Sequence, residues 1–175
     1  MPAFAAARWS GMLRAASLLG AVILVAVGVA AAMAIPRGTR VPFAEAFGML
    51  VAIVPPAIVV AAVLTVVRGY DLDRNSLCIR RLLWWTTVPL AGLVRVAADP
   101  TLVRGSVRVF GNGGLFAFTG RYRNRALGPY RAFVTDWTHA VVLELPGRVV
   151  VVSPADPAAF VRAVAARFPA VAVSA

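Results

Sequence analysis

Two long stretches without an ionisable side chain dominate the first 67 residues of the chain. The first runs from Ala15 to Pro36 and the second from Ala46 to Val67. Each is long enough to cross a hydrocarbon core about 30 Å thick, which takes roughly 20 helical residues. Because a backbone inside a bilayer must satisfy its own hydrogen bonds, we expect two transmembrane helices. The composition agrees, since 61% of the 175 residues are hydrophobic and 14% are charged, against roughly 45–50% and 25% in soluble domains.

The charges that flank these stretches predict their orientation. Residues 37–45 form a short connection, so we expect an antiparallel hairpin with both termini on one side. The connection carries two basic residues, Arg37 and Arg40, together with Glu45. The opposite side carries Arg8, Arg14, Arg68, Arg74, Arg80 and Arg81. The positive-inside rule therefore places both termini in the cytoplasm, with residues 1–14 as a cytoplasmic tail and the connection outside.

Three details of the two stretches bear on how they function. Pro55-Pro56 interrupts the second stretch, and the loss of two backbone donors predicts a kink there. Ala32-Met33-Ala34 has the small-x-small pattern of a signal-peptide cleavage site. The apolar run before it exceeds the roughly 7–15 residues of a typical signal, so we expect the first helix to be retained. Gly20 and Gly28 permit close helix approach, which favours self-association.

The composition changes after Arg68, where runs of β-branched and aromatic residues alternate with turn signals. This spacing predicts short strands. The expected strands are 77–83, 84–90, 103–110, 115–125, 130–135, 139–145 and 148–153, with 92–97 as a candidate for a further short one. Gly111–Gly114 is interpreted as a tight loop between two of them, and Pro146-Gly147 as a hairpin turn. About seven antiparallel strands of this kind predict a small sandwich or barrel.

The last element of the chain is predicted to be helical. Asp156 is a favourable N-cap, and Pro157 suits the first helical turn. Apolar side chains then recur at helical spacing, at Phe160, Val161, Val164 and Phe168. The predicted fold class is therefore a two-helix transmembrane hairpin followed by a mainly-β barrel or sandwich that one C-terminal α-helix caps.

This order of elements is similar to the pleckstrin-homology-like (PH-like) architecture, and local residues resemble a bacterial, membrane-anchored PH-like domain family. Tyr70–Leu83 resembles the opening strand of that family, 108–116 and 127–136 its glycine-rich centre, and 149–161 its closing strand and helix entry. The resemblance covers residues 70–170 and leaves 171–175 as a tail. It implies a membrane-anchored bacterial PH-like domain of poorly defined function. It implies neither an activity nor a lipid site, because a fold alone does not carry function.

Residues that could carry catalysis or bind a metal are few. Asp136, His139 and Ser153 are the residue types of a hydrolytic triad, which needs all three within hydrogen-bond reach. The Gly-x-Ser-x-Gly motif is absent, so we interpret Asp136–His139 as a turn and Ser153 as the end of a strand. Asp71 and Asp73 offer too few oxygen ligands for a divalent cation, and one Cys with one His cannot form a zinc cage. The sequence predicts no catalytic site, no metal and no cofactor.

The arginines carry the main functional signal, since all 18 basic residues are Arg and the net charge is +11. Arg121, Arg123 and Arg125 alternate, so on a strand all three face one side. Arg104 and Arg108 share a face of their own strand. The candidate residues for binding lipid or another anionic partner are Arg104, Arg108, Arg121, Arg123, Arg125 and Arg131. The alternative is a solvated strand face, and nucleic acid is disfavoured because no recognition helix or stacking platform is evident.

We therefore expect a non-catalytic binding module held in the bacterial inner membrane. It would recruit or organise a protein partner, or sense anionic lipid, whose attraction for basic residues is strongest at the membrane surface. A homo-oligomer is a further expectation. The alternatives are an enzyme and an accessory subunit of a larger membrane complex. A transporter is disfavoured because neither apolar stretch contains an ionisable residue.

Overall fold

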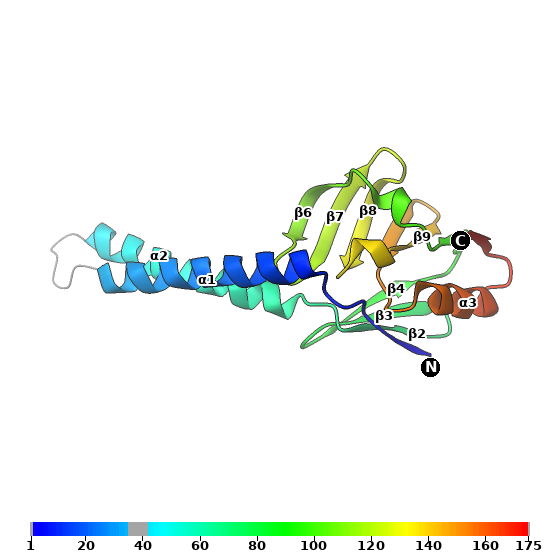
Figure 1. Cartoon of the computed structure of the whole chain (residues 1–175), viewed down its shortest axis with the longest axis horizontal. Coiled ribbons are helices and arrows are strands. Elements are labelled where there is room, and N and C mark those ends of the chain that lie inside the picture. Colours follow the sequence, from blue (N-terminus) through cyan, green and yellow to red (C-terminus); the bar gives the residue numbers. More distant parts are fainter. Residues whose placement is uncertain (1, 35–41, 175) are drawn as a thin grey trace.

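The computed structural model describes residues 2–34 and 42–174. Two long helices, α1 (Gly11–Ala34) and α2 (Pro42–Leu64), lie side by side and project from one side of a β-rich domain (Figure 1). Most of the connection expected at residues 37–45 lies outside the described residues. The helical hairpin is thus a long projection from the domain and not part of its core.

Each helix contains a segment long and apolar enough to cross a membrane, Leu13–Ala34 in α1 and Glu45–Leu64 in α2. Most of each segment is exposed, unlike the core helix of a soluble protein. The two helices approach each other closely at Gly28, where an added Cβ would lie 2.8 Å from the carbonyl oxygen of Ala52 and 2.9 Å from Cδ of Pro56. Gly28 thus permits packing within the hairpin. Helix α2 continues through both of its internal prolines, where the kink remains a prediction.

The domain contains two sheets. The four-stranded sheet has the order β1–β2–β3–β4 and is antiparallel. Its strands are β1 (Ala3–Ala5), β2 (Gly69–Leu72), β3 (Ser76–Arg80) and β4 (Trp85–Pro89). The seven-stranded sheet has the order β11–β5–β9–β10–β8–β7–β6. Its strands are β5 (Arg95–Ala97), β6 (Val107–Gly113), β7 (Phe118–Asn124), β8 (Gly128–Val134), β9 (Val141–Leu145), β10 (Arg148–Val152) and β11 (Ala172–Ser174).

The predicted fold class is confirmed, although the sheets hold more strands than expected and two pairings are parallel. β8 pairs with β10 in parallel, which sets Arg131 opposite Val150, and β5 pairs with β11 in parallel. The tight loop expected at Gly111–Gly114 lies later in the chain. β6 extends to Gly113 because Gly111 pairs with Gly120 of β7, and the turn occupies residues 114–117.

Segments near both ends of the described chain pair with the sheets of the domain, whereas the sequence analysis treated residues 1–14 and 171–175 as tails. β1 pairs with β2, and the amide of Ala7 donates to the carbonyl of Ser153 at 2.8 Å. β11 adds an edge strand to the large sheet. These segments satisfy backbone groups that would otherwise be unpaired at two sheet edges. The N-terminal segment and the domain therefore lie at the same end of the helical hairpin (Figure 1).

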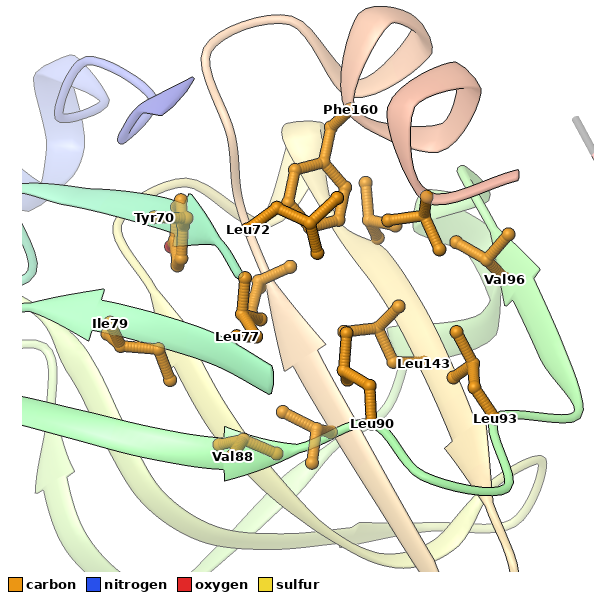
Figure 2. Close-up of a cluster of buried hydrophobic side chains, with 14 of the residues drawn as sticks. Tyr70, Leu72, Leu77, Ile79, Val88, Leu90, Leu93, Val96, Leu143 and Phe160 are labelled. Carbon is orange, nitrogen blue, oxygen red and sulfur yellow. The ribbon is translucent and has the colours of Figure 1, made fainter. Parts of the chain in front are cut away.

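The main core lies between the two sheets and α3 (Pro157–Arg167). Buried side chains from all three layers meet there, among them Tyr70, Leu72, Leu77, Leu143 and Phe160 (Figure 2). As predicted, Asp156 caps α3 by accepting a hydrogen bond from the amide of Ala159 at 2.9 Å, and Pro157 occupies the first turn. This burial of large apolar side chains is the principal term that stabilises the domain.

A second, smaller core covers the outer face of the seven-stranded sheet. Two short 3₁₀ helices lie over this face, η1 (Pro100–Val103) and η2 (Trp137–His139). Beneath them the rings of Tyr122 and Tyr130 stack with centroids 6.0 Å apart. The large sheet is therefore covered on its outer face by these helices and over part of its inner face by the small sheet.

Candidate functional site

The small sheet covers only part of the inner face of the large sheet, and arginines occupy the uncovered part. β7 and β8 alternate between the two faces. Tyr122 and Tyr130 point to the outer core, whereas Arg121, Arg123 and Arg131 are exposed on the inner face. Arg121 lies directly opposite Arg131 across the β7–β8 pair. Paired strand residues share a face, so these three side chains form one basic surface.

This surface forms the floor of a groove that runs between the two sheets. One cavity of about 640 Å³ lies between β4 and the strands β7, β8 and β10, and a second of about 770 Å³ lies nearer the end of α2. Both are lined by Arg121 and Arg131, so they adjoin. Each volume falls in the range of roughly 300–1,000 Å³ that is typical of ligand pockets.

Arg81 lies at the end of the groove beside α2. Its Nη1 donates to the carbonyl of Thr65 at 2.8 Å, and its Nε donates to Oγ1 of Thr86 at 3.1 Å. The guanidinium carbon is 5.4 Å from the centroid of the Phe133 ring, and that of Arg131 is 5.3 Å from the same centroid. One buried aromatic ring therefore contacts two cations, a favourable contact for each.

Burial lowers the pKa of Arg81 below its usual value, and the positive charge of Arg131 lowers that pKa further. Arg81 nevertheless stays protonated, because a guanidinium is charged at every physiological pH. The two arginines therefore repel each other, and an anion bound between them would offset this repulsion.

Arg148 completes the groove at its other end. It begins β10, and its Nη2 donates to the carbonyl of Pro89 at the free edge of β4. Arg148 therefore bridges the two sheets. We refer to the five side chains that line the groove as the groove arginines. They are Arg81, Arg121, Arg123, Arg131 and Arg148.

Five of the seven acidic side chains are engaged away from the groove. Two form ion pairs with other arginines, Asp71 with Arg80 at 3.2 Å and Glu144 with Arg95 at 3.3 Å. Three others cap helices, namely Asp99, Asp136 and Asp156. Across the described part of the chain, no salt bridge involves a groove arginine. The groove is therefore a concentration of positive charge that the protein itself does not neutralise.

The structure divides the six arginines that the sequence analysis grouped as one candidate site. Arg121, Arg123 and Arg131 line the groove. Arg104 and Arg108 lie on the outer face, where they line a different cavity, and Arg108 donates to the carbonyl of Gly111 in its own strand. The sixth, Arg125, lies in the turn after β7. β7 ends at Asn124, so only two of the three arginines that were expected on one face of this strand, Arg121 and Arg123, belong to it.

Arg81 and Arg148 were not among the predicted binding residues. Arg81 counted only as a charge that flanks the second apolar stretch. Its position three residues before two consecutive tryptophans, Trp84 and Trp85, was a weak signal of an interaction surface. Arg148 reaches the groove because β10 pairs in parallel with β8. No local sequence pattern specifies that pairing, because β9 lies between the two strands in the chain.

The residues of the possible triad do not form a nucleophile–base pair. Asp136 Oδ2 and His139 Nδ1 lie 3.6 Å apart in the η2 turn. Ser153 is fully buried, with its Oγ accepting from the amide of Thr135 at 2.8 Å and its own amide donating to the hydroxyl of Tyr70 at 3.0 Å. Within residues 2–34 and 42–174, no hydrogen bond joins Ser153 to His139. In the same residues, no group of three or more His, Cys, Asp or Glu side chains is placed to hold a metal ion.

Comparison with known proteins identifies the domain. The sequence matches the bacterial PH domain family over residues 68–168, which is more than half of the chain. The chain belongs to the bacterial PH domain family. No curated protein and no solved structure matches it significantly.

The family match confirms the resemblance that the sequence analysis based on the glycine-rich centre and the closing strand with its helix. It supports a binding module as the general kind of role for this PH domain. It covers the groove arginines and leaves out both α1 and α2. The ligand and the role of the helical hairpin therefore rest on the groove geometry and on the apolar surface of the helices.

Proposed function

We propose that this protein is a non-catalytic binding module, anchored in the inner membrane by α1 and α2, whose groove binds anionic lipid headgroups at the cytoplasmic face. The anchor is supported by two apolar helices that expose most of their surface outside the domain. Exposed apolar helices of this length are stable when lipid covers them. The cytoplasmic orientation rests on the excess of arginines on the side of the termini.

The observation that carries the proposal is the set of groove arginines without carboxylate partners, placed next to the end of α2. Arginine presents a planar fork of donors that matches a phosphate group bidentately. A bilayer rich in anionic lipid attracts each nearby basic residue by about 1 kcal/mol. A domain tethered beside that surface meets headgroups constantly, so a cluster of five cations there has a ready ligand.

A protein partner is the competing occupant, and one feature of the structure favours it. β4 and β6 each end a sheet, and both border the groove. An extended acidic segment could add to either free edge and present its carboxylates to the groove arginines. The lipid is favoured because it is present wherever the helices are anchored. An acidic protein partner is therefore a distinct outcome of the test.

The test uses the full chain, because β1 belongs to the domain. Short-chain phosphatidylglycerol, or phosphatidylcholine as the neutral comparison, is titrated into the protein in a non-ionic detergent, and native mass spectrometry counts the bound lipid. The first variant is Arg121→Ser/Arg123→Ser/Arg131→Ser. The matched control is Arg104→Ser/Arg108→Ser/Arg125→Ser, which removes the same charge from the outer face and the β7–β8 turn.

We expect the groove variant to lose about 100-fold in affinity for phosphatidylglycerol, since three lost contacts of about 1 kcal/mol each sum to roughly 3 kcal/mol. The control should lose far less, and raised salt should weaken wild-type binding because screening weakens exposed charges. Equal losses in both variants would overturn the groove as the lipid site. Inorganic phosphate is titrated in parallel, and binding of phosphate without binding of phosphatidylglycerol would indicate a soluble phosphate ligand. Binding of neither would leave an acidic protein partner as the occupant.

A further inference from the structure

The turn between β3 and β4 lies at the end of the domain from which the helices project (Figure 1). Two strand pairings fix this position. Gly69, which follows the end of α2 by five residues, pairs with Arg80, and Arg80 pairs with Trp85. Arg81 in the turn also donates to the carbonyl of Thr65. The turn is therefore held beside the last residues of α2.

This turn exposes large apolar side chains to the exterior. Its consecutive apolar residues are Leu82, Leu83, Trp84 and Trp85. Leu83 and Trp85 are each 72% exposed, and Phe110 of β6, across the groove, is 76% exposed. Trp84 and Phe110 line the same cavity as Arg81. A compact cluster of exposed leucine, tryptophan and phenylalanine marks an interaction surface rather than an ordinary solvated turn.

The contacts of α1 set the depth of this surface relative to a bilayer. Ser17 accepts a hydrogen bond from the amide of Phe116 at 2.8 Å and donates to the carbonyl of Gly114 at 3.1 Å. The β6–β7 turn is thus fixed to α1 at Ser17. The helix from Ser17 to Ala34 is roughly 26 Å long at 1.5 Å per residue, and a hydrocarbon core is about 30 Å thick. A bilayer that covers α1 must therefore reach the level of this turn.

The β3–β4 turn is at the same level. Asn112, next to the β6–β7 turn, donates to Oγ1 of Thr65 at 3.2 Å, and Thr65 is also the residue that holds Arg81. Tryptophan favours the boundary between headgroups and acyl chains, because its ring is apolar and its N–H remains hydrated or bonded. Arginine in the same turn suits the phosphates just above that boundary.

We infer that the β3–β4 turn, with Phe110 beside it, inserts into the headgroup–acyl boundary of the bilayer that holds the helices. The insertion orients the domain so that the groove opens at the level of the headgroups. The inference rests on the proposed membrane anchor, but it does not require lipid in the groove. The partner of the β3–β4 turn is thus the lipid surface. Three features support this partner: the turn is apolar, arginines lie next to it, and both adjoin the end of α2.

The experiment places a single tryptophan at each of three depths in the full chain, reconstituted in vesicles of mixed neutral and anionic lipid. The test protein keeps Trp85 and carries Trp9→Phe, Trp84→Phe and Trp137→Phe. In a background where all four tryptophans are Phe, Val25→Trp reports on α1. Val94→Trp reports on the exposed loop that follows the far end of β4 and leads into β5. Quenching is measured with lipids brominated near the top of the acyl chain and with lipids brominated near its end.

We expect Trp85 to lose most of its fluorescence with the shallow quencher and to emit at shorter wavelength than the Val94→Trp reporter, which should keep its fluorescence. The Val25→Trp reporter should respond to the deep quencher. Quenching in α1 without quenching of Trp85 would overturn the inference and leave the anchor intact. No quenching at any position would overturn the anchor, and the inference with it. Equal quenching at Trp85 and at the far end would also contradict the orientation.

Discussion

The two faces of the seven-stranded sheet are built from the same strands, but their arginines have different surroundings. On the outer face, Arg108 lies beside the stacked rings of Tyr122 and Tyr130, and it donates to Gly111 of its own strand. On the inner face, Arg121 and Arg131 lie opposite each other with no carboxylate partner in the described chain. The residue type is the same, so the difference lies in what covers each face.

Different elements cover the two faces of the seven-stranded sheet. On the outer face the short helices η1 and η2 close over a small core. On the inner face the four-stranded sheet covers Phe133 but ends before Arg131. Buried positions in β8 are therefore apolar on both faces, and a charge is tolerated only where cover stops. This uncovered strip is what makes the inner face available for a ligand.

The largest loss of stability is expected from Gly120→Ala, which adds a side chain where β7 packs closely against β6. Gly120 has a φ of 148°, and an added Cβ would overlap the carbonyl oxygen of Phe110 and lie 2.9 Å from Cα of Gly111. The backbone strain alone costs about 1–3 kcal/mol. The overlap adds to it, because relief requires β6 to separate from β7. We expect a large drop in the thermal unfolding midpoint of the detergent-solubilised chain.

Gly147→Ala is the matched control for that substitution. Gly147 also has a positive φ, 71°, but an added Cβ would meet nothing within 4 Å. Its cost should stay near the roughly 1–2 kcal/mol of a left-handed residue. If both variants unfold at the same temperature, the close packing of β6 against β7 does not stabilise this edge of the seven-stranded sheet.

Phe133→Ala and Val134→Ala compare the two faces directly, because these neighbours belong to opposite cores. Truncation of a buried Phe costs about 3–5 kcal/mol, and that of a smaller Val costs less. Phe133 also supports Arg81 and Arg131 through its ring. We expect Phe133→Ala to lower both stability and affinity for phosphatidylglycerol, and Val134→Ala to lower stability only. Denaturant unfolding and lipid titration of the same samples check both effects, and equal affinity losses would contradict the role of Phe133.

Several elements could be predicted from the sequence because their causes are local. The apolar stretches need only their length and lack of charge, and α3 needs only the Asp156 cap, Pro157 and helical spacing. The domain family followed from the glycine-rich centre and the closing motif. In each case the residues that determine the structure lie next to one another in the chain.

The groove could be predicted only in part, because non-local pairing creates it. The irregular register between Arg108 and Phe110 sets Arg108 opposite Tyr122 and Phe110 opposite Arg121, so simple alternation fails there. Arg148 reaches the site through the parallel β8–β10 pairing. Arg125 fell outside the strand because a turn begins there. Sequence alternation identifies two sides of a strand, but it does not reveal which side another sheet will cover.

The smallest effect concerns pH and again separates the two faces. Tyr70 belongs to the inner core, where its hydroxyl donates to the carbonyl of Phe133 at 2.6 Å. Burial raises the pKa of Tyr70 to about 12, and hydrogen bonds with Ser153 partly oppose that rise. The unfolded chain releases the proton near pH 10. The proton therefore stabilises the fold fully below about pH 10, and this contribution of roughly 2–3 kcal/mol is lost as the pH rises towards 12.

The measurement is the free energy of unfolding of the full chain in detergent across this alkaline range. Tyr70→Phe should lower stability at neutral pH by about 1–3 kcal/mol, because the Phe133 carbonyl and the Ser153 amide lose their partner, but it should flatten the alkaline decline. Tyr122→Phe is the outer-face comparison. Burial also raises the pKa of Tyr122 to about 12, with the charge of Arg108 opposing that rise. Its hydroxyl lies beside the outer cavity, where water reduces the effect. The contrary outcome is an alkaline decline in the free energy of unfolding that is steeper for Tyr70→Phe than for Tyr122→Phe. It would show that ionisation of Tyr122, on the outer face, destabilises the fold more than ionisation of Tyr70 does.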